Sequence, residues 1–203
     1  MILSNVELHK ALDEHRLVVR PEPLPRAPSI GLDHCPYDTH SVDLRLADEI
    51  SVPRPGQFCY DVTKPGRIAE TIKEHSDHFK LTPHQPYRLE PSTFVLGRTL
   101  EWIELPIDAR RTDCLAARIE GKSSRARFGV LVHFTAPTVH PGFKGHLTLE
   151  IINLGPATIL LVPGMYIAQL IVEEVRGCPN QNPSQFQGQV TAAGLPDLEP
   201  EQS

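Results

Sequence analysis

The sequence lacks any long apolar run and any strongly basic segment. No stretch of 18 apolar residues occurs in the 203 residues, so no membrane-spanning helix is expected. The N-terminal Met1-Ile2-Leu3-Ser4 also lacks the basic region and long apolar stretch of a signal peptide. With 20 Lys and Arg against 25 Asp and Glu the net charge is -5, whereas a duplex-binding protein needs a positive patch facing phosphates. We therefore expect a cytoplasmic protein that binds neither membranes nor nucleic acid.

Cysteine is scarce, and several motifs are missing. The four cysteines (35, 59, 114 and 178) show no CxxC spacing, which argues against a structural zinc site and favours reduced thiols. The HxE and PCxxC signatures of zinc-dependent nucleotide deaminases are absent. GxxxxGK[ST], GxGxxG and GxSxG are absent too. We therefore expect no metal-ligating residues and none of these nucleotide-binding or hydrolase loops.

Proline, in contrast, is abundant. The 20 prolines suit loops, turns and edge strands, and they argue against a helical bundle. A capping box at Ser4 and Glu7 predicts a helix over residues 4–16, and a second short helix is expected over 67–78. Apolar or alternating segments predict strands at 17–19, 42–46, 94–97, 101–105, 115–120, 130–134, 147–152, 158–162 and 166–172. We expect one mainly β domain over 1–176 and a flexible C-terminal arm over 177–203.

The segment Gly121-Lys122-Ser123-Ser124-Arg125-Ala126-Arg127-Phe128-Gly129 has the composition of a phosphate-binding turn. Two hydroxyls and three cations lie within six residues, between two glycines. If Ser123 opens a short helical turn, free backbone N–H groups meet at one point and Arg127 lies one turn further on the same face. Hydroxyls and a bidentate guanidinium suit phosphate. The alternative is a serine N-cap on a solvated basic turn, and composition does not decide between the two.

Glu150 is an isolated carboxylate in an apolar strand. It stands between Leu149 and Ile151, and alternation places it on the same face as Thr148 and Ile152. A buried carboxylate is costly unless it is paired or functional, and burial moves a carboxyl pKa towards the range useful for proton transfer. The alternative is a carboxylate on the wet face of a half-exposed strand.

Two further segments predict turns between strands. Residues 133–145, HFTAPTVHPGFKG, indicate a strand that leads into a Pro-Gly turn and a further strand. In Val162-Pro163-Gly164-Met165, the positions of Pro and Gly fit a type II turn.

Taken together, these segments form an ordered set. GKSSRARFG, HFTAPTVHPGFKG, LTLEIIN and VPGMYIAQL follow one another as G-R-S-S-x-A-R-x-G, H-x-T-A-x-x-I-D-P-G-F-x-G, T-L-E-x-x-N and P-G-M-x-I-x-Q-L do in dCTP deaminases. Residues 40–46 are similar to that family's S-V-D-L-R-L strand, and 186–189 to its closing K-Y-Q-G-Q. The chain thus resembles the dCTP deaminase/dUTPase superfamily from residue 1 to about 190, most densely over 118–172. The part around 50–85 is less familiar.

The resemblance implies a distorted jelly-roll-like β-barrel of the dUTPase type, in a homotrimer with active sites at subunit interfaces. It implies a metal-free hydrolytic attack on C4 of the cytosine ring that converts dCTP to dUTP and ammonia, with Mg²⁺ bound only to the triphosphate. Glu150 corresponds to the carboxylate that activates water and passes protons. Ser123 and Arg127 correspond to catalytic residues around that water and the phosphates. Further substrate contacts are implied for Lys122, Ser124, Ala136, Thr138, Val139, His140, Gln169 and Gln189.

Four positions depart from the family pattern. His140 replaces an Asp that lies near the sugar in both branches and assists attack on the α-phosphate in dUTPases. Lys122 replaces an Arg and loses its bidentate geometry. Gln185 replaces a phosphate-binding Lys of the arm, and Cys178 stands near the position of an arm Tyr. These changes predict altered phosphate recognition, such as a modified nucleotide or one with fewer phosphates.

Three hypotheses therefore stand. The leading one is a deaminase acting on a cytosine deoxynucleotide, most simply dCTP. The second is a dUTPase-type nucleotide pyrophosphatase, which His140 disfavours. The third is a non-catalytic trimeric nucleotide-binding module, which the altered arm favours and the retained Glu150 disfavours.

Overall fold

The computed structural model describes residues 1–31, 34–56, 61, 68–108, 110–177, 179–180, 182 and 186–195. Its helices are α1 (Asn5–Asp13), α2 (Ile68–Glu74) and α3 (Ser123–Ala126). Its strands are β1 (Val18–Arg20), β2 (Val42–Arg45), β3 (Glu49–Pro53), β4 (Ser76–Lys80), β5 (Tyr87–Leu89), β6 (Phe94–Glu104), β7 (Asp113–Gly121), β8 (Val130–Val132), β9 (Thr138–Val139), β10 (Lys144–Asn153), β11 (Ile159–Leu161) and β12 (Tyr166–Arg176). The mainly β class is therefore confirmed.

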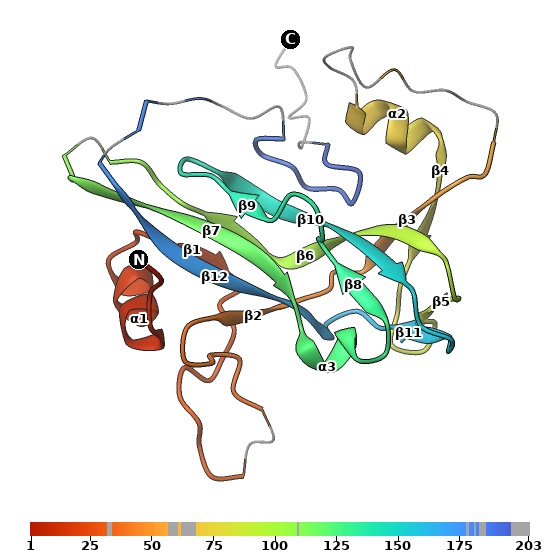
Figure 1. The fold of residues 1–203 in the computed structure, drawn as a ribbon, viewed down its shortest axis with the longest axis horizontal. Helices are drawn as coiled ribbons and strands as arrows, with labels where there is room; N and C mark the ends of the chain where they lie inside the picture. Colours follow the sequence, from red (N-terminus) through yellow and green to blue (C-terminus); the bar gives the residue numbers. More distant parts are fainter. Residues whose placement is uncertain are drawn as a thin grey trace.

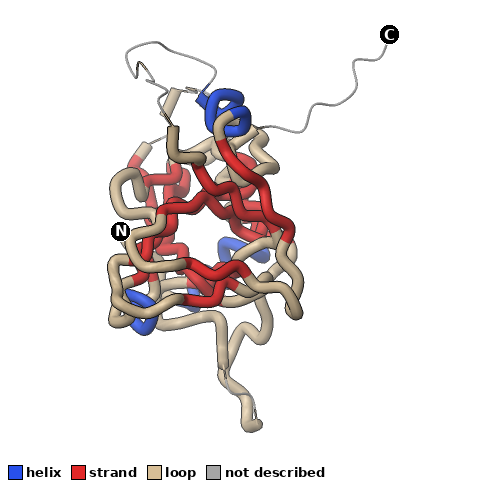
Figure 2. The backbone as a smooth tube through the Cα atoms, turned by 90° about the vertical axis from the view of Figure 1, so that its right-hand side faces the viewer, coloured by secondary structure: helices blue, strands red, loops and turns tan. Residues whose placement is uncertain are grey.

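Two antiparallel sheets enclose a single hydrophobic core (Figures 1 and 2). One has the order β4-β3-β6-β10-β8, with β1 also paired to β6, and the other has the order β2-β12-β7-β9. A short ribbon of β11 and β5 is separate from both. Fully buried Leu149 and Ile151 of β10 and Ile119 of β7 belong to one cluster, so both sheets contribute to the same core. This arrangement agrees with the expected jelly-roll-like architecture.

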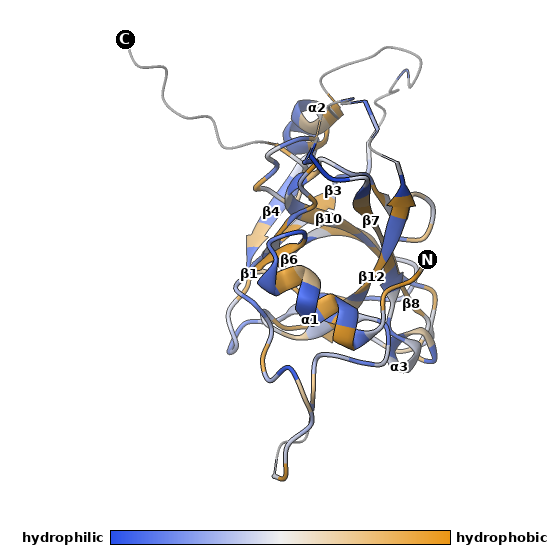
Figure 3. Cartoon of the chain, turned by 90° about the vertical axis from the view of Figure 1, so that its left-hand side faces the viewer, coloured by the Kyte–Doolittle hydropathy of each residue, from blue (hydrophilic) through white to orange (hydrophobic). Residues whose placement is uncertain are grey.

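Helix α1 forms where the capping box predicts it. Ser4 is the N-cap, and its hydroxyl accepts a hydrogen bond from the backbone N–H of Glu7 at 3.4 Å. The apolar residues Leu8, Ala11 and Leu12 are buried, and Figure 3 shows hydrophobic and hydrophilic segments alternating along the helix. The helix ends before residue 16, and His15 has a positive φ of 54°. Within the described part of the chain, no helix combines the length and apolar character needed to cross a membrane.

Strand β6 corrects the prediction of two separate strands at 94–97 and 101–105. It runs unbroken over 11 residues because Gly97 permits close packing rather than ending the strand. A Cβ atom at Gly97 would lie 2.8 Å from Cδ1 of Leu46, which is closer than real Cβ contacts.

The region 49–80 differs most from expectation. The second helix is shorter than predicted, because Ser76–Lys80 forms strand β4. This strand pairs with β3, and β3 pairs with β6 at Ser51 and Leu96. The sequence pattern predicts neither strand: β3 is short and ends at a proline, and β4 is polar apart from Phe79. The result is that α2 stands over the sheet that contains β10 (Figure 1).

Two turns place the ends of strands. Gly164 has φ 81°, and the Met165 N–H donates to the Val162 carbonyl at 3.2 Å, which confirms the type II turn. Behind α3, Gly129 has φ 86° and its carbonyl accepts the Leu154 N–H at 2.8 Å. A Cβ atom on Gly129 would lie 2.2 Å from the backbone nitrogen of Gly155, so the two segments cross without room for a side chain.

Part of the predicted C-terminal arm lies against β10. The Gly188 N–H donates to the Lys144 carbonyl at 2.7 Å, and the His146 N–H donates to the Gln189 carbonyl at 3.0 Å. Ala192 and Ala193 are buried. The predicted departures at 178 and 185 lie outside the described residues. The division at residue 177 and the flexibility of the arm stay predictions.

Candidate active site

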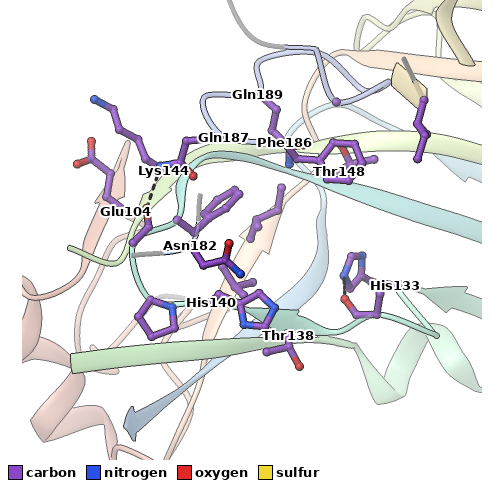
Figure 4. A pocket seen from close by; sticks show the side chains of 18 of the residues that line it. Glu104, His133, Thr138, His140, Lys144, Thr148, Asn182, Phe186, Gln187 and Gln189 are labelled. Atoms are coloured by element: carbon purple, nitrogen blue, oxygen red, sulfur yellow. Dashed lines mark hydrogen bonds between the residues drawn. The ribbon is translucent and has the colours of Figure 1, made fainter. Parts of the chain in front are cut away.

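A cavity of about 780 Å³ lies against the face of β10 that points away from the core. Glu150 and Thr148 line it from that strand, as alternation predicts. The segment 136–143 forms another wall, and Ile68 and Ile72 of α2 contribute an aliphatic surface. Figure 4 shows Thr138 and His140 on one side of the cavity and Phe186 and Gln189 of the arm on the other.

Glu150 is paired with His133, which is not among the predicted site residues. His133 Nδ1 lies 2.7 Å from Glu150 Oε2, and the exposed fractions of the two side chains are 12% and 31%. The other ring nitrogen, Nε2, lies 2.8 Å from the Ala136 carbonyl oxygen. Both ring nitrogens thus face oxygen atoms that accept hydrogen bonds, an arrangement that suits the doubly protonated imidazolium.

The backbone holds this pair in place. Strand β8 ends at Val132, one residue before His133, which has φ 55° in the left-handed region. The predicted strand over 130–134 is therefore too long, because this conformation cannot continue a β ladder. The His133 N–H still donates to the Glu150 carbonyl at 2.8 Å, so the two residues are joined through main chain and side chain.

The environment of His133 favours its charged form. Burial lowers the pKa of its imidazole, but the Glu150 carboxylate and the carbonyls of Ala136 and Thr148 raise it more strongly, so the net pKa lies above 6.5. The raised pKa of His133 and its 2.7 Å distance to Glu150 together favour an ion pair at the cavity wall.

The predicted substrate-binding stretch also lies at the cavity. Ala136, Thr138, Val139 and His140 all line it. Strand β9 pairs with β7 through Ala117 and Val139, which buries the Val139 side chain and presents its neighbours to the cavity.

The arm reaches the cavity at Gln189, as the resemblance implies. Its side-chain amide donates to the His146 carbonyl at 2.5 Å, and only 5% of the residue is exposed. Gln187 donates to the Gly142 carbonyl at 2.8 Å. A Cβ atom at Gly145 would lie 3.1 Å from the Gln189 nitrogen, so this glycine lets the arm approach β10.

The remaining predicted residues lie elsewhere on the chain. Ser123 opens the short helix α3, as predicted, and Ser124 and Arg127 are exposed beside it. None of the three is among the described residues that line the cavity. One chain therefore holds two groups of predicted site residues, one at the cavity and one at the α3 turn.

Lys122 and Gln169 belong with the α3 turn. Lys122 Nζ lies 2.5 Å from Oδ2 of Asp43, a buried residue that also lies 2.9 Å from His34 Nε2. Gln169 pairs with Asp43 across β12 and β2. Lys122 is thus tied to a buried carboxylate at the base of the turn, and neither residue lines the cavity within the described chain.

Some cavity residues carried little signal in the sequence. His133 opens the HFTAPTVHPGFKG segment, but a lone histidine at a strand end has many ordinary explanations. Ile68 and Ile72 lie in the region that resembles the family least, and their i,i+4 spacing marks only an apolar helix face. Their places became visible only with the tertiary fold.

Known proteins match the chain over most of its length. The dCTP deaminase-like family matches residues 2–175. The chain is 34% identical to the dCTP deaminase of Rhodospirillum rubrum, over 85% of this chain and 82% of that protein. It is 35% identical to the dCTP deaminase of Natronomonas pharaonis, over 93% of this chain and 91% of that protein. It is also 35% identical to a dUMP-forming dCTP deaminase of Mycolicibacterium paratuberculosis, over 93% and 92% of the two chains.

A solved structure supports the fold. The 2'-deoxycytidine 5'-triphosphate deaminase from Agrobacterium tumefaciens is similar with a TM-score of 0.60 and 21% identity, over 84% of this chain and 47% of that chain. Motif order, the residues gathered at the cavity and the match over residues 2–175 agree, and the chain belongs to the dCTP deaminase-like family.

Proposed function

We propose that this protein is a dCTP deaminase, which hydrolyses the 4-amino group of dCTP to give dUTP and ammonia. The Glu150–His133 pair in the cavity wall is the observation that carries the proposal. The names of the relatives, dCTP deaminases in each case, support the choice of substrate.

Proton movement defines the role of Glu150. Hydrolysis forms a bond from the water oxygen to C4 and breaks the bond from C4 to the amino nitrogen. One proton must leave the water, and one must reach the departing amine. A carboxylate can accept the first proton and donate the second. The pair with His133 keeps the Glu150 carboxylate oriented. His133, held by the Ala136 carbonyl, positions Glu150.

The α3 turn completes the site from a second copy of the chain. Within one chain, Ser123, Ser124 and Arg127 are exposed and away from the cavity wall. Next to them, Phe128 is 62% exposed and Leu154 is 61% exposed, an apolar surface that suits burial between subunits. In the proposed homotrimer, each turn faces the cavity of a neighbouring subunit.

The turn and the arm hold the nucleotide in this proposal. The hydroxyls of Ser123 and Ser124 and the Arg127 guanidinium bind the triphosphate, which arrives with Mg²⁺ as part of the substrate. Lys122 supports the turn through its contact with Asp43. Gln169 of β12, which pairs with Asp43 of β2, has the same supporting role. Ala136, Thr138 and Val139 contact the base, and Gln189 closes the cavity.

We assign dUTP rather than dUMP as the product. His140 lines the cavity at the position where dUTPases have the carboxylate that assists attack on the α-phosphate. A cytoplasmic location and the absence of nucleic-acid or membrane partners belong to the same proposal.

A substrate panel tests the proposal. Purified protein with Mg²⁺ is incubated with dCTP, dCMP, CTP and dUTP while ammonia and pyrophosphate are followed. Ammonia from dCTP without pyrophosphate is the expected result. Ammonia from dCMP alone would contradict the assignment of dCTP, and pyrophosphate from dUTP would contradict the role given to His140. Release of neither ammonia nor pyrophosphate from any of the four nucleotides would contradict the assignment as a deaminase.

A further inference from the structure

Thr148 carries a hydroxyl for which the described part of the fold provides no hydrogen-bond partner. It stands two residues before Glu150 on the same face of β10, and both residues line the cavity. Its Oγ1 is sealed from solvent and has no hydrogen-bond partner within the described part of the chain. A buried hydroxyl without a partner destabilises a fold, and native proteins contain few of them.

A neighbouring threonine shows how this sheet satisfies a hydroxyl that has a structural role. Thr99 of β6 is fully buried. Its Oγ1 donates to the Glu101 carbonyl at 2.7 Å and accepts the Leu147 N–H at 2.9 Å. Thr148 has no such arrangement, so its hydroxyl is not explained by the needs of the sheet.

The location of Thr148 indicates what it binds. Residues two apart on a strand are separated by about 7 Å, enough for one polar group of a ligand to lie between their side chains. The Glu150–His133 pair lies at the same wall of the cavity. Because the Thr148 hydroxyl now makes no hydrogen bond, rotation about its Cα–Cβ bond into the cavity breaks none.

We propose that Thr148 is a substrate-binding residue whose hydroxyl accepts a hydrogen bond from the 4-amino group of cytosine. This inference rests on the proposed function, which puts C4 beside Glu150. The 4-amino group is attached to C4 and offers two N–H donors, so it is the group of the ring that Glu150 and Thr148 reach together. The contact orients the amine that must leave.

A double-mutant cycle between protein and ligand tests the contact. Glu150→Gln stops turnover, and in this background the Kd values of dCTP and of 2'-deoxyzebularine 5'-triphosphate, which carries hydrogen at C4, are measured by calorimetry. Removal of the amino group should weaken binding about three- to ten-fold, the range of one neutral hydrogen bond. With Thr148→Val added, the difference between the two ligands should shrink several-fold, and with Thr148→Ser it should return.

Stability separates this role from a structural one. Thr148→Val should leave the melting temperature unchanged or raised, since it removes an unpaired buried hydroxyl. The matched control Thr99→Val should lower the melting temperature and leave the ratio of Kd values unchanged. An unchanged ratio in the Thr148→Val background, or a Thr148→Val protein that loses stability as Thr99→Val does, would overturn the proposal. Wild-type protein that releases no ammonia from dCTP would instead contradict the proposed function.

Discussion

At the residue scale, Glu150 and His133 form one unit, because their side chains lie 2.7 Å apart and the Glu150 carboxylate raises the pKa of His133. Glu150 lies on a strand whose opposite face is fully buried, so its position is set by the core. His133 lies at the end of a strand in a left-handed conformation and is held through both ring nitrogens. The Glu150 carboxylate is thus placed by a strand of the sheet and oriented by a neighbouring side chain.

Glu150→Gln should lower kcat for dCTP by at least about a thousand-fold, since the amide cannot accept the proton from water. The substitution preserves size, so dCTP binding by calorimetry and the circular dichroism spectrum should stay close to those of the wild type. Near-normal ammonia release from this variant would refute the mechanism.

The raised pKa of His133 predicts a pH-dependent contribution to stability. A group whose pKa is higher in the folded than in the unfolded state stabilises the fold below the unfolded value, here 6.5, and loses that contribution as the pH rises through the folded value. The wild type should therefore exceed His133→Gln in free energy of unfolding at pH 6, and the difference should shrink towards pH 9. Urea titrations at several pH values measure this. In the Glu150→Gln background the pH dependence should be smaller, and an unaltered dependence would show that Glu150 is not its cause.

At the element scale, the crossing of Gly129 and Gly155 joins the α3 turn to the end of β10. The backbones approach closely because neither residue carries a side chain. The turn with its exposed hydroxyls is therefore anchored to the same strand that carries Glu150.

Gly129→Ala should destabilise the fold by more than about 2 kcal/mol, since it adds a backbone clash to the cost of a positive φ. Gly164→Ala is the matched control, because Gly164 has φ 81° but nothing lies within 4 Å of its Cβ position. That control should cost only about 1 kcal/mol. Chemical denaturation of both variants measures the difference, and equal losses would contradict the role of the close approach.

Most elements could be predicted from local pattern, and the failures have physical causes. The alternation in β7, β10 and β12 and the capping box of α1 are local signals that the fold preserves. The predicted strand end at Gly97 is wrong. This glycine is needed for close packing against Leu46, which is distant in sequence. Strands β3 and β4 were missed because Ser51 is buried only through pairing on both sides. Such effects need the tertiary partner and cannot be read from neighbouring residues.

At the scale of the whole molecule, the two groups of predicted site residues lie apart on one chain. The sequence motifs identify both groups, and the resemblance implies active sites at subunit interfaces, but the strand patterns show no interface. The exposed Phe128 and Leu154 beside the turn suit the subunit contact of the proposed trimer. His133 was missed for a similar reason, since its partners Ala136 and Glu150 meet only in the fold.

Subunit mixing tests the shared site. Glu150→Gln and Arg127→Ala chains should each be inactive alone, because one lacks the cavity carboxylate and the other the guanidinium of the turn. Co-assembled at equal amounts, they should recover about a quarter of wild-type activity, since half of the cavities are intact and half of the neighbouring turns are intact. A mixture of Glu150→Gln with the double variant is the control and should stay silent. No recovery in the first mixture, with mixed trimers present by mass, would place both groups within one chain.

Because the cavity and the turn lie apart on each chain, a defective subunit should also lower the activity of intact subunits in the same trimer. In the proposed trimer, a chain without Glu150 and Arg127 inactivates its own cavity. It also supplies a defective turn to the cavity of one neighbouring chain. About one site in three then survives although two chains are intact. Such a chain has a dominant-negative effect. In a cell that carries both versions, it lowers the activity of the intact chains that assemble with it.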